Sequence, residues 1–477
     1  MDAEMSRPRA PLAQYLAEML PSSESGPLTL GLVDWQDTPP GLPGNPPSAA
    51  DAPCDTVVWN ATGSPNPVSR VADLRQRLSG SGLLLAAVAL PAATGRRATR
   101  EEGALPTSDQ AFLRRLVLAI SEGGFAILED REVTSDTGAW QLIKARLDPF
   151  EFRAYREGDE DAILALFPLC FHVQRGIDHW RWKYVDNPWG RHHISLSFSP
   201  RGDLSTHYAG YPVPFRYTDR KGKVRSFPAL QMGDTMNNPD YRHIGRARSS
   251  LLARTVRHFF ALYRGGPFGF FYGFNTGGIQ RFCRWFIGGT QVEPVGFWTR
   301  SLEGAADYWP KVRGYSIERV ERVDSGWDRF FERVAPEYGF LVERNARYVD
   351  WRYLQCPDAE YVVLSAKRWG RLVGWGVFRR KEDRIIWGDA LFSPRHTEAA
   401  TEILRSALGQ PELRGAKTMD AWFSRGPLWW VEPLVDLGFN NEPEPNRLSF
   451  MALPEGEPEA AERLGELYYT MGDGDLF

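Results

Sequence analysis

An internal repeat in the last two-thirds of the chain is the feature that most limits how it folds. Three pairs of segments match in the same order: WKYVDNP with WRYLQCP, GDTMNNP with GDALFSP, and a Phe followed by Glu-Pro with the same pattern further on. They begin at Trp182 and Trp351, Gly233 and Gly388, and Phe274 and Phe423. The spacing between partners shrinks along the chain, as expected when the second of two copies has shorter loops. The sequence therefore predicts copy one at residues 149–302, copy two at 315–455 and a polar tail at 456–477.

Length and composition place the chain among globular proteins. Its 477 residues correspond to about three domains, and 43% hydrophobic residues supply enough apolar surface for packed cores. A net charge of -3 predicts no strong attraction to nucleic acid or to an anionic membrane. The four cysteines are widely spaced without a CxxC pattern, so we expect neither a metal site nor disulfides. No signal-peptide core and no run of 18 apolar residues occurs, so we expect a cytoplasmic protein.

Residues 1–148 alternate apolar runs with helical patterns, which is typical of an α/β domain. We expect strands at 28–33, 55–59, 83–90 and 125–130, with helices at 68–80 and 110–124. The order resembles the second half of a class I methyltransferase, but LGLVDWQDTPPG stands where such enzymes carry a glycine-rich loop for S-adenosylmethionine. We therefore expect a degenerate Rossmann-like domain without chemistry, suited to contact a second copy in a homodimer or a biosynthetic partner.

The most specific stretch of the chain is ALQMGDTMNNPDYRHIGRARSSLLARTVRHFF in copy one. Its pattern predicts a strand to Asp234, a turn and a helix that begins near Gly245. The unpaired N–H groups and the dipole at a helix start favour an anion such as a diphosphate. Gly245 permits close backbone approach, and Arg242 and Arg246 add positive charge.

This stretch resembles the acyl-CoA loop of GCN5-related N-acetyltransferases (GNATs). The matching residues follow Pro-Asp-Tyr and are Arg242, His243, Ile244, Gly245, Arg246 and Ala247. The resemblance implies acetyl-CoA or another acyl-CoA as cofactor, no metal, and a strand carrying Met232 and Gly233 that splays from its neighbour to pair with the pantetheine arm. It implies direct acyl transfer to an amine of a small molecule or peptide. The fold class implied is α/β: two tandem GNAT folds, each a mixed, mostly antiparallel sheet flanked by helices, after the small α/β domain.

The catalytic groups are less clearly marked than the loop. In the family an Asn after the next strand often contacts the cofactor arm, a role that Asn275 fits. A Tyr seven residues further often protonates the leaving thiolate, but position 282 is Phe, which leaves the neighbouring Cys283 as a candidate donor. A general base needs a carboxylate or an imidazole near the amine, and the candidates are Asp234 and His207. Asp234 has the alternative role of a turn cap.

Copy two preserves the strand, turn and helix but not the loop. Its residues 395–399 read RHTEA, so no Gly matches Gly245, and Glu398 would repel phosphate. We expect copy two to be a structural partner, with the aromatic clusters HWRWKYVDNPWG and LWWVEPLVDLGF forming core and the contact between copies. Two alternatives to an enzyme of this kind stay open: a non-catalytic acyl-CoA-binding scaffold, and a Fem-like aminoacyl transferase, which would not need the loop.

Overall fold

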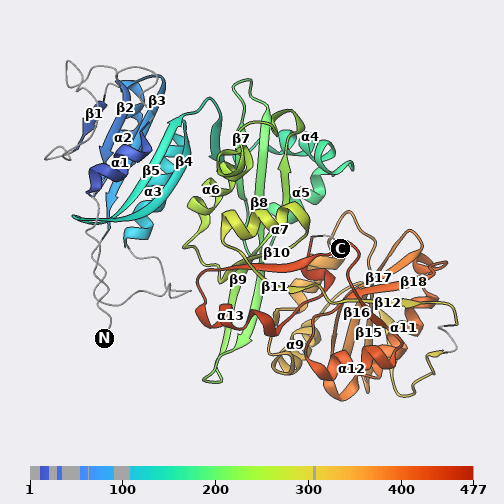
Figure 1. Cartoon of the computed structure of the whole chain (residues 1–477). Helices are drawn as coiled ribbons and strands as arrows, with labels where there is room; N and C mark the ends of the chain where they lie inside the picture. The colour runs from blue at the N-terminus through green and yellow to red at the C-terminus, as the bar shows by residue number, and fades with distance from the viewer. Residues whose placement is uncertain are drawn as a thin grey trace.

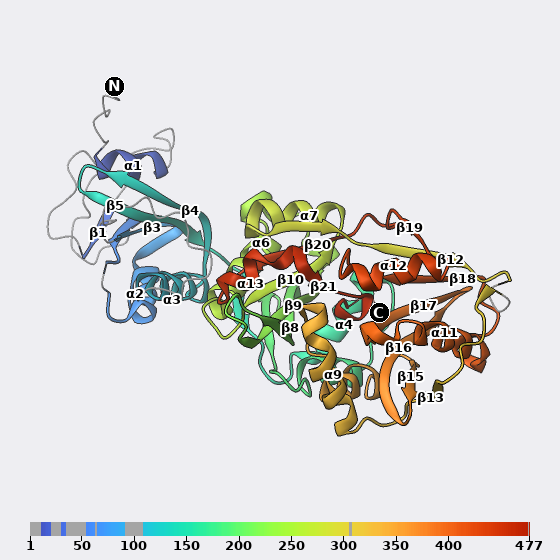
Figure 2. The same cartoon turned by 90° about the horizontal axis from the view of Figure 1, so that it is seen from below.

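Three β-sheets follow one another along the molecule. The computed structural model describes residues 11–20, 30–34, 54–62, 64–90, 108–304, 308–475 and 477. The amino-terminal domain lies at one end, copy one in the middle and copy two at the other end (Figures 1 and 2). The expected fold class is confirmed: two mixed, mostly antiparallel sheets flanked by helices follow a small α/β domain.

The amino-terminal domain is a five-stranded sheet of order β1-β2-β3-β5-β4. Strands β1 to β3 are parallel, β5 is antiparallel to β3, and β4, which pairs antiparallel with β5, again runs in the direction of β1 to β3. The elements are α1 (Leu12–Met19), β1 (Leu30–Val33), β2 (Cys54–Asn60), α2 (Pro67–Arg77), β3 (Leu78–Ala89), α3 (Ser108–Glu122), β4 (Phe125–Ser135) and β5 (Gly138–Leu147). The expected strands coincide with β1 to β4 where the structure describes them. The expected helices correspond to α2 and α3 but end earlier, because residues 78–80 already belong to β3 and α3 ends at Glu122, and β5 was not foreseen. The methyltransferase resemblance stays a prediction.

Copy one is built on a sheet that contains the run β7-β8-β9-β10, with β6 beside β7. Its elements are β6 (Glu151–Ala154), α4 (Glu160–Phe171), α5 (Ile177–Tyr184), β7 (His193–Phe198), β8 (Leu204–Thr218), β9 (Val224–Asn237), α6 (Leu251–Tyr263), β10 (Phe270–Asn275), α7 (Gly277–Phe282) and β11 (Thr290–Pro294). Strand β8 is buried along nearly its whole length because helices cover both faces of the sheet. Successive side chains of β8 point to opposite faces of the sheet. His207 contacts Tyr184 of α5 on one face, and Tyr208 contacts Phe259 of α6 on the other.

Copy two repeats this arrangement around a seven-stranded sheet of order β13-β15-β16-β17-β18-β12-β19. Its elements are β13 (Ser316–Arg319), α9 (Ser325–Tyr338), β14 (Phe340–Val342), α10 (Ala346–Val349), β15 (Val362–Arg368), β16 (Arg371–Lys381), β17 (Arg384–Phe392), α11 (Ala399–Gly409), β18 (Thr418–Trp422), α12 (Leu428–Asp436) and β19 (Asn440–Glu442). The exception is β14, which pairs with β8 of copy one. The repeat recognised in the sequence therefore corresponds to matched strands and helices, with β9 and β17 as partners.

Besides β14, each copy passes its last strand to the sheet of the other copy. Strand β12 (Phe297–Ser301) follows β11 of copy one but pairs with β18 and β19. Strand β20 (Ser449–Pro454) follows β19 of copy two but lies between β10 and β11. In Figure 1 the red β20 accordingly runs beside strands of copy one. The expected boundaries at residues 302, 315 and 455 therefore separate the two copies in the sequence, but each sheet contains a strand from the other copy.

The repeated Trp residues meet where the two copies touch. Trp182 Nε1 donates to the Trp351 carbonyl oxygen at 2.7 Å, and Trp351 Nε1 donates to the Trp182 carbonyl oxygen at 3.2 Å. Their rings stack with centroids 5.0 Å apart. The contact is nearly symmetric because each partner is the same position of the repeat, and it agrees with the expected use of these aromatic clusters as core and contact between copies.

The expectation of a polar tail at 456–477 is wrong. After α13 (Pro458–Glu462), β21 (Leu467–Tyr468) pairs with β14. The following acidic side chain of Asp473 is 2% exposed and receives a hydrogen bond from Arg344 Nη2 at 2.6 Å. Tyr272 of copy one donates to the Asp473 carbonyl oxygen at 3.2 Å. A buried arginine of copy two and a buried tyrosine hydroxyl of copy one therefore hold this acidic segment inside the protein.

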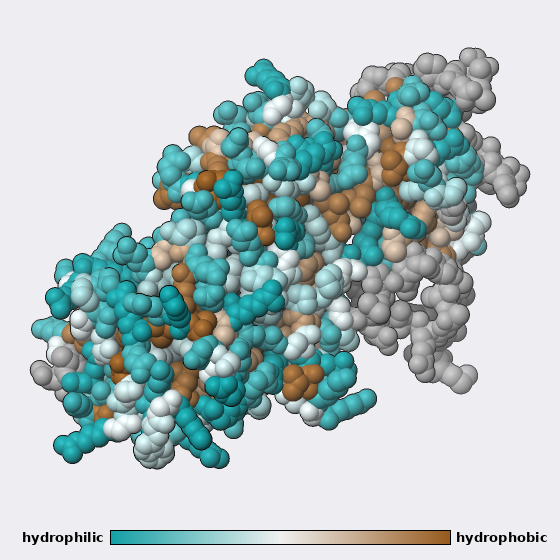
Figure 3. Space-filling view, turned by 180° about the vertical axis from the view of Figure 1, so that it is seen from behind, coloured by the Kyte–Doolittle hydropathy of each residue, from teal (hydrophilic) through white to brown (hydrophobic). Residues whose placement is uncertain are grey.

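The amino-terminal domain docks on α6 of copy one. Arg254 forms a buried ion pair with Asp148, and Arg257 Nη1 donates to the Ile127 carbonyl oxygen at 2.9 Å. Ala261 packs into the core of the amino-terminal domain. The face of the molecule in Figure 3 is largely hydrophilic, with hydrophobic residues in small groups. No helix in the described segments is long and apolar enough to cross a membrane.

Candidate acyl-CoA site

Strands β9 and β10 diverge in the middle of the copy-one sheet. They pair in parallel at Leu230 with Phe271 and at Gln231 with Tyr272, and no later pair is formed along these two strands. Beyond this point β9 continues to Asn237, and a gap opens between the two strands. The splay expected from the family resemblance is therefore present in copy one.

A narrow pocket occupies this gap on the side covered by α6 and α7. It is lined by Tyr208, Met232, Thr235, Phe260, Phe271, Tyr272, Gly273, Asn275, Ile279, Phe282, Cys283, Ile287, Gly289, Met451, Ala452 and Leu453. Three residues singled out in the sequence, Met232, Asn275 and Cys283, thus share one pocket. The pocket's free volume is about 50 Å³, so a ligand arm would enter from the open end of the splay and move flexible side chains such as Met232 aside.

The loop after β9 is longer than the sequence pattern suggested. Two 3₁₀ turns, at Pro239–Tyr241 and Ala247–Ser249, precede α6, which begins at Leu251. Ser250 caps this helix, since its Oγ accepts from Ala253 N at 3.2 Å. The expected helix start near Gly245 is wrong because Gly245 and Ala247 have φ angles of 72° and 50°, which a helix cannot include.

The loop nevertheless has the shape of an anion cradle. A Cβ on Gly245 would lie 2.1 Å from the Ser249 carbonyl oxygen, so only glycine fits. Within the described part of the chain, the N–H groups of His243, Gly245 and Ala247 have no hydrogen-bond acceptor. Successive free N–H groups around left-handed residues form a concave anion site. The neighbouring positions Arg242, Arg246 and Arg248 are exposed, so the cradle also carries positive charge.

In copy two the corresponding space is filled. Beyond the splay of β17 and β18, four buried aromatic rings pack together, those of Trp387, Phe423, Trp430 and Phe439. The Tyr338 hydroxyl accepts from Phe392 N at 2.9 Å and donates to its carbonyl oxygen at 3.2 Å, which occupies the backbone of β17. In place of the loop, Glu398 Oε1 accepts a hydrogen bond from Tyr315 at 2.7 Å. Among the described residues, copy two therefore has no cradle like that around Gly245, and aromatic rings pack in the space beyond the paired part of β17 and β18.

Asp234 lies on the opposite face of the sheet from the pocket. Lys183 Nζ and the Tyr184 hydroxyl both donate to Asp234 Oδ2, each at 2.8 Å. Burial alone would raise the pKa of this carboxyl, but the charge and hydrogen bond of Lys183 outweigh it and hold the pKa far below its usual range. A carboxylate bound in this way is a weak base, so the geometry favours a structural role for Asp234. Its φ of 50° marks a bulge in β9.

His207 shares this face with Asp234. Its Nδ1 donates to the Asp234 carbonyl oxygen at 2.7 Å, while Nε2 is buried without a partner in the described residues. Burial lowers the pKa of the imidazole to about 4, so His207 is neutral at pH 7. It has a free lone pair, but alternation along β8 points it away from the pocket, as shown by its contact with Tyr184.

Cys283 lies at the other wall of the pocket. Asn275 Nδ2 donates a hydrogen bond to Cys283 Sγ at 3.6 Å. The expected contact to the cofactor arm and the expected proton donor are therefore neighbours in one pocket. Burial raises the pKa of the Cys283 thiol to about 11. The thiol therefore keeps its proton at neutral pH.

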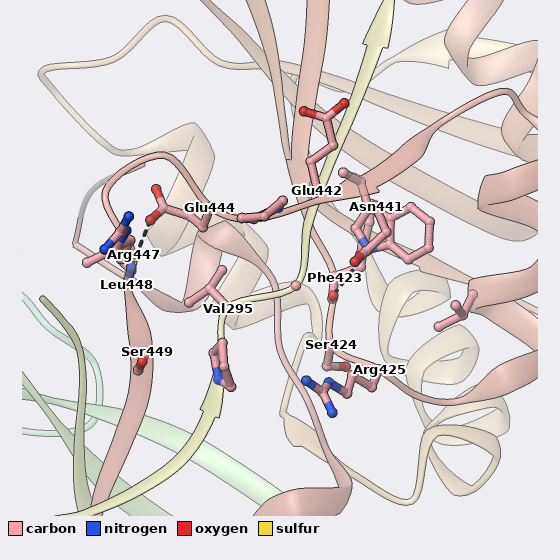
Figure 4. Close-up of a pocket in the computed structure, with 15 residues that line it drawn as sticks. Val295, Phe423, Ser424, Arg425, Asn441, Glu442, Glu444, Arg447, Leu448 and Ser449 are labelled. Atoms are coloured by element: carbon pink, nitrogen blue, oxygen red, sulfur yellow. Dashed lines mark hydrogen bonds between the residues drawn. The ribbon is translucent and has the colours of Figure 1, made fainter.

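A second, wider cavity opens where the exchanged strands cross between the sheets. This strand-exchange pocket has a volume of about 670 Å³ and is lined by Pro294, Val295, Gly296, Trp298, Phe423, Ser424, Arg425, Val431, Asn441, Glu442, Pro443, Glu444, Arg447, Leu448 and Ser449. In Figure 4, Glu444 and Arg447 lie on one side, Phe423 and Arg425 on the other, and Val295 between them. Its Ser449 is the cross-strand partner of Asn275 in the narrow pocket between β9 and β10, so the two cavities lie near each other on neighbouring strands, although none of the described residues lines both.

Comparison with known proteins adds similarity at the level of the fold. No protein-family model matches the chain, and no curated protein matches its sequence. A conserved Enterococcus faecalis V583 protein, described as a probable N-acyltransferase, is 14% identical over 65% of this chain and 73% of its own, with a TM-score of 0.48. Saccharomyces cerevisiae N-myristoyltransferase with bound myristoyl-CoA is 9% identical over 64% and 83% of the two chains (TM-score 0.43).

A third similar structure is a tandem GNAT protein from the clavulanic acid biosynthesis pathway. It is 14% identical over 64% of this chain and 98% of its own, with a TM-score of 0.43. At these identities and scores, the function of this chain rests on the geometry of its own site.

Several residues of the site escaped the sequence analysis. Lys183 and Tyr184 were read only as part of a repeated segment, although they fix Asp234. The repeat carried a signal for Tyr184, because Tyr184 and Asp234 of copy one both recur in copy two, as Tyr353 and Asp389. In the structure, Tyr353 donates a hydrogen bond to Asp389 at 2.6 Å, as Tyr184 does to Asp234. Tyr208 had no such signal, since nothing near it in the sequence is repeated or forms a motif. The described residues contain no group of three or more His, Cys, Asp and Glu side chains placed to hold a metal ion.

Proposed function

We propose that the protein is an acyl-CoA-dependent N-acyltransferase whose reaction takes place in copy one. The observation that carries the proposal is the continuity of three features: the splay of β9 and β10, the pocket inside it, and the cradle around Gly245 at its outer end. An acyl-CoA has a matching order of groups, with a thioester, an extended amide-bearing arm and a diphosphate. Acetyl is the simplest acyl group in this proposal.

The residues of copy one divide the binding task. The N–H groups of His243, Gly245 and Ala247, with the side chains of Arg242 and Arg246, would hold the diphosphate. The strand β9 at Met232 and Gly233, and the Asn275 amide, would pair with the polar groups of the arm. Acyl-CoA supplies an activated thioester when bound, and the closely packed pocket would exclude water from it. The chain itself therefore needs only to orient the reactants and manage protons.

We further propose that the acceptor amine enters through the strand-exchange pocket. This cavity is far larger than the splay pocket, the narrow pocket between β9 and β10, and its Ser449 is the cross-strand partner of Asn275 in that pocket. Its lining carries two carboxylates, Glu442 and Glu444, and two cations, Arg425 and Arg447, so it offers charged partners to a polar acceptor such as an amine-bearing small molecule or peptide. The suggested contact of the amino-terminal domain with a second copy or a biosynthetic partner remains a proposal.

The loop assignment is tested by Gly245→Ala. The new Cβ would collide with the Ser249 carbonyl oxygen and distort the cradle, so we expect acetyl-CoA to bind at least about tenfold more weakly by calorimetry. Gly222→Ala is the matched control, because Gly222 has a similar φ of 77° but open space around it. If the two variants bind acetyl-CoA as tightly as the parent, the cradle does not bind the diphosphate.

Transfer itself is tested by thiol release from acetyl-CoA with a panel of amines. Release with at least one amine supports the enzyme. Tight acetyl-CoA binding without thiol release in the presence of any amine would favour the alternative, a non-catalytic acyl-CoA-binding protein. Phe282 is consistent with that alternative, because it stands where the family often has a proton-donating Tyr.

A further inference from the structure

A tyrosine of β8, Tyr208, lines the splay pocket. Tyr208 is 4% exposed, and its ring packs edge-on against Phe259 of α6 with centroids 5.0 Å apart. Among the residues that the structure describes, none forms a hydrogen bond with the Tyr208 hydroxyl. A tyrosine hydroxyl that borders a pocket and has no partner in the protein is placed to bind a ligand there.

Tyr208 faces Cys283 across the gap. Tyr208 stands on β8 beside the bulge of β9, whereas Cys283 follows α7 and is held by Asn275 at the end of β10. Burial raises the pKa of Tyr208 well above its usual value, and the nearby Cys283 adds to the shift. An arm that runs between β9 and β10 would pass between these two side chains, because they line opposite walls of the same pocket.

We propose that the Tyr208 hydroxyl is the hydrogen-bond and proton donor to the CoA sulfur, in place of the tyrosine that is absent at position 282. This inference rests on the proposed acyltransferase function. In the reaction, the acceptor nitrogen forms a bond to the thioester carbonyl carbon, and the bond from that carbon to sulfur breaks. The sulfur takes the proton of Tyr208, the nitrogen loses one proton to solvent, and Tyr208 recovers a proton from solvent.

Tyr208 suits this role better than Cys283 does. An O–H group is a strong donor, whereas a thiol is a weak one. Asn275 already directs an N–H group at Cys283 Sγ, so this sulfur acts as an acceptor in the structure. Cys283 then forms the opposite wall of the channel and Tyr208 supplies the proton.

Binding measurements test the contact without relying on turnover. We would compare CoA with desulfo-CoA, which lacks the thiol, by calorimetry on the parent and on Tyr208→Phe. Loss of the hydroxyl should weaken CoA by about three- to tenfold while leaving desulfo-CoA unchanged. Tyr211→Phe is the matched control: it removes a buried hydroxyl from the same strand, but this hydroxyl is bonded to Gln231 on the other face.

The outcomes separate the inference from the function on which it rests. An unchanged ratio of the two affinities in Tyr208→Phe would overturn the role of Tyr208 while leaving acyl-CoA binding intact. Failure of the parent to bind either ligand would remove the proposed function, and the inference with it. In turnover, Tyr208→Phe should lower kcat by about 100-fold with little change in KM for acetyl-CoA; an unchanged kcat would also contradict the proposal.

Discussion

At the scale of single residues, the copy-one site is organised by pairs that the fold brings together from distant positions. Lys183 and Tyr184 of α5 fix Asp234 in the bulge of β9, and Asn275 contacts Cys283 in the pocket. Sequence reasoning found Gly245, Asn275 and Cys283 because they lie in or beside a motif. It missed Tyr208 and Lys183 because their roles depend on which face of the sheet they occupy and on the helix that covers that face.

The role of Asp234 leads to a prediction about stability. Asp234→Asn should lower the free energy of unfolding by about 3 kcal/mol at pH 7, because it leaves the buried Lys183 ammonium without its closest carboxylate. The pKa of Asp234 is lower in the folded protein than in the unfolded chain, so its contribution is present above roughly pH 4 and is lost as the pH falls toward the folded pKa. The difference between parent and variant should therefore shrink below about pH 4.

Denaturant unfolding between pH 3 and pH 8 measures this difference. Asp240→Asn serves as the control, because Asp240 is exposed and forms no ion pair within the described residues. An Asp234→Asn variant as stable as the parent at pH 7, with an acyl-transfer rate reduced by orders of magnitude, would instead restore Asp234 as the general base.

At the scale of elements, the repeat predicted two matched sets of strands and helices but not the exchange between them. Strands β12 and β20 each lie at the end of the copy to which they belong in the sequence. Sequence order does not reveal which sheet edge a strand joins, because both edges offer equivalent backbone partners. The exchange places the segments around residues 294–297 and 442–449 side by side, and these segments form most of the strand-exchange pocket.

The acceptor route through this pocket is tested by Asn441→Trp. Asn441 is exposed on β19 and lines the pocket, so an indole there should obstruct it and raise KM for the amine by about tenfold. The affinity for acetyl-CoA should not change. Asn440→Trp is the matched control, since Asn440 is the exposed neighbour on the same strand but lies outside the lining. Equal amine KM values for both variants and the parent would place the acceptor elsewhere.

At the scale of the whole molecule, one fold serves two purposes. Copy one keeps an open splay with a cradle at its outer end, while copy two fills the same space with aromatic rings and tyrosine hydroxyls. The amino-terminal domain supports α6, the helix that follows the cradle, through Arg254 and Arg257. The sequence showed that copy two lacks the loop, because no Gly matches Gly245. It did not show that the space between β17 and β18 is filled, because the filling depends on packing between helices and on Tyr338 of α9.

The number of acyl-CoA molecules bound per chain tests the central claim most directly. Titration of the full-length protein with acetyl-CoA by calorimetry should give one site, and Gly245→Ala should remove or weaken that site by itself. Two equivalent sites would mean that the packed cleft of copy two opens to a ligand, and no detectable site would mean that the cradle and splay of copy one do not bind acyl-CoA. Either result would contradict the account.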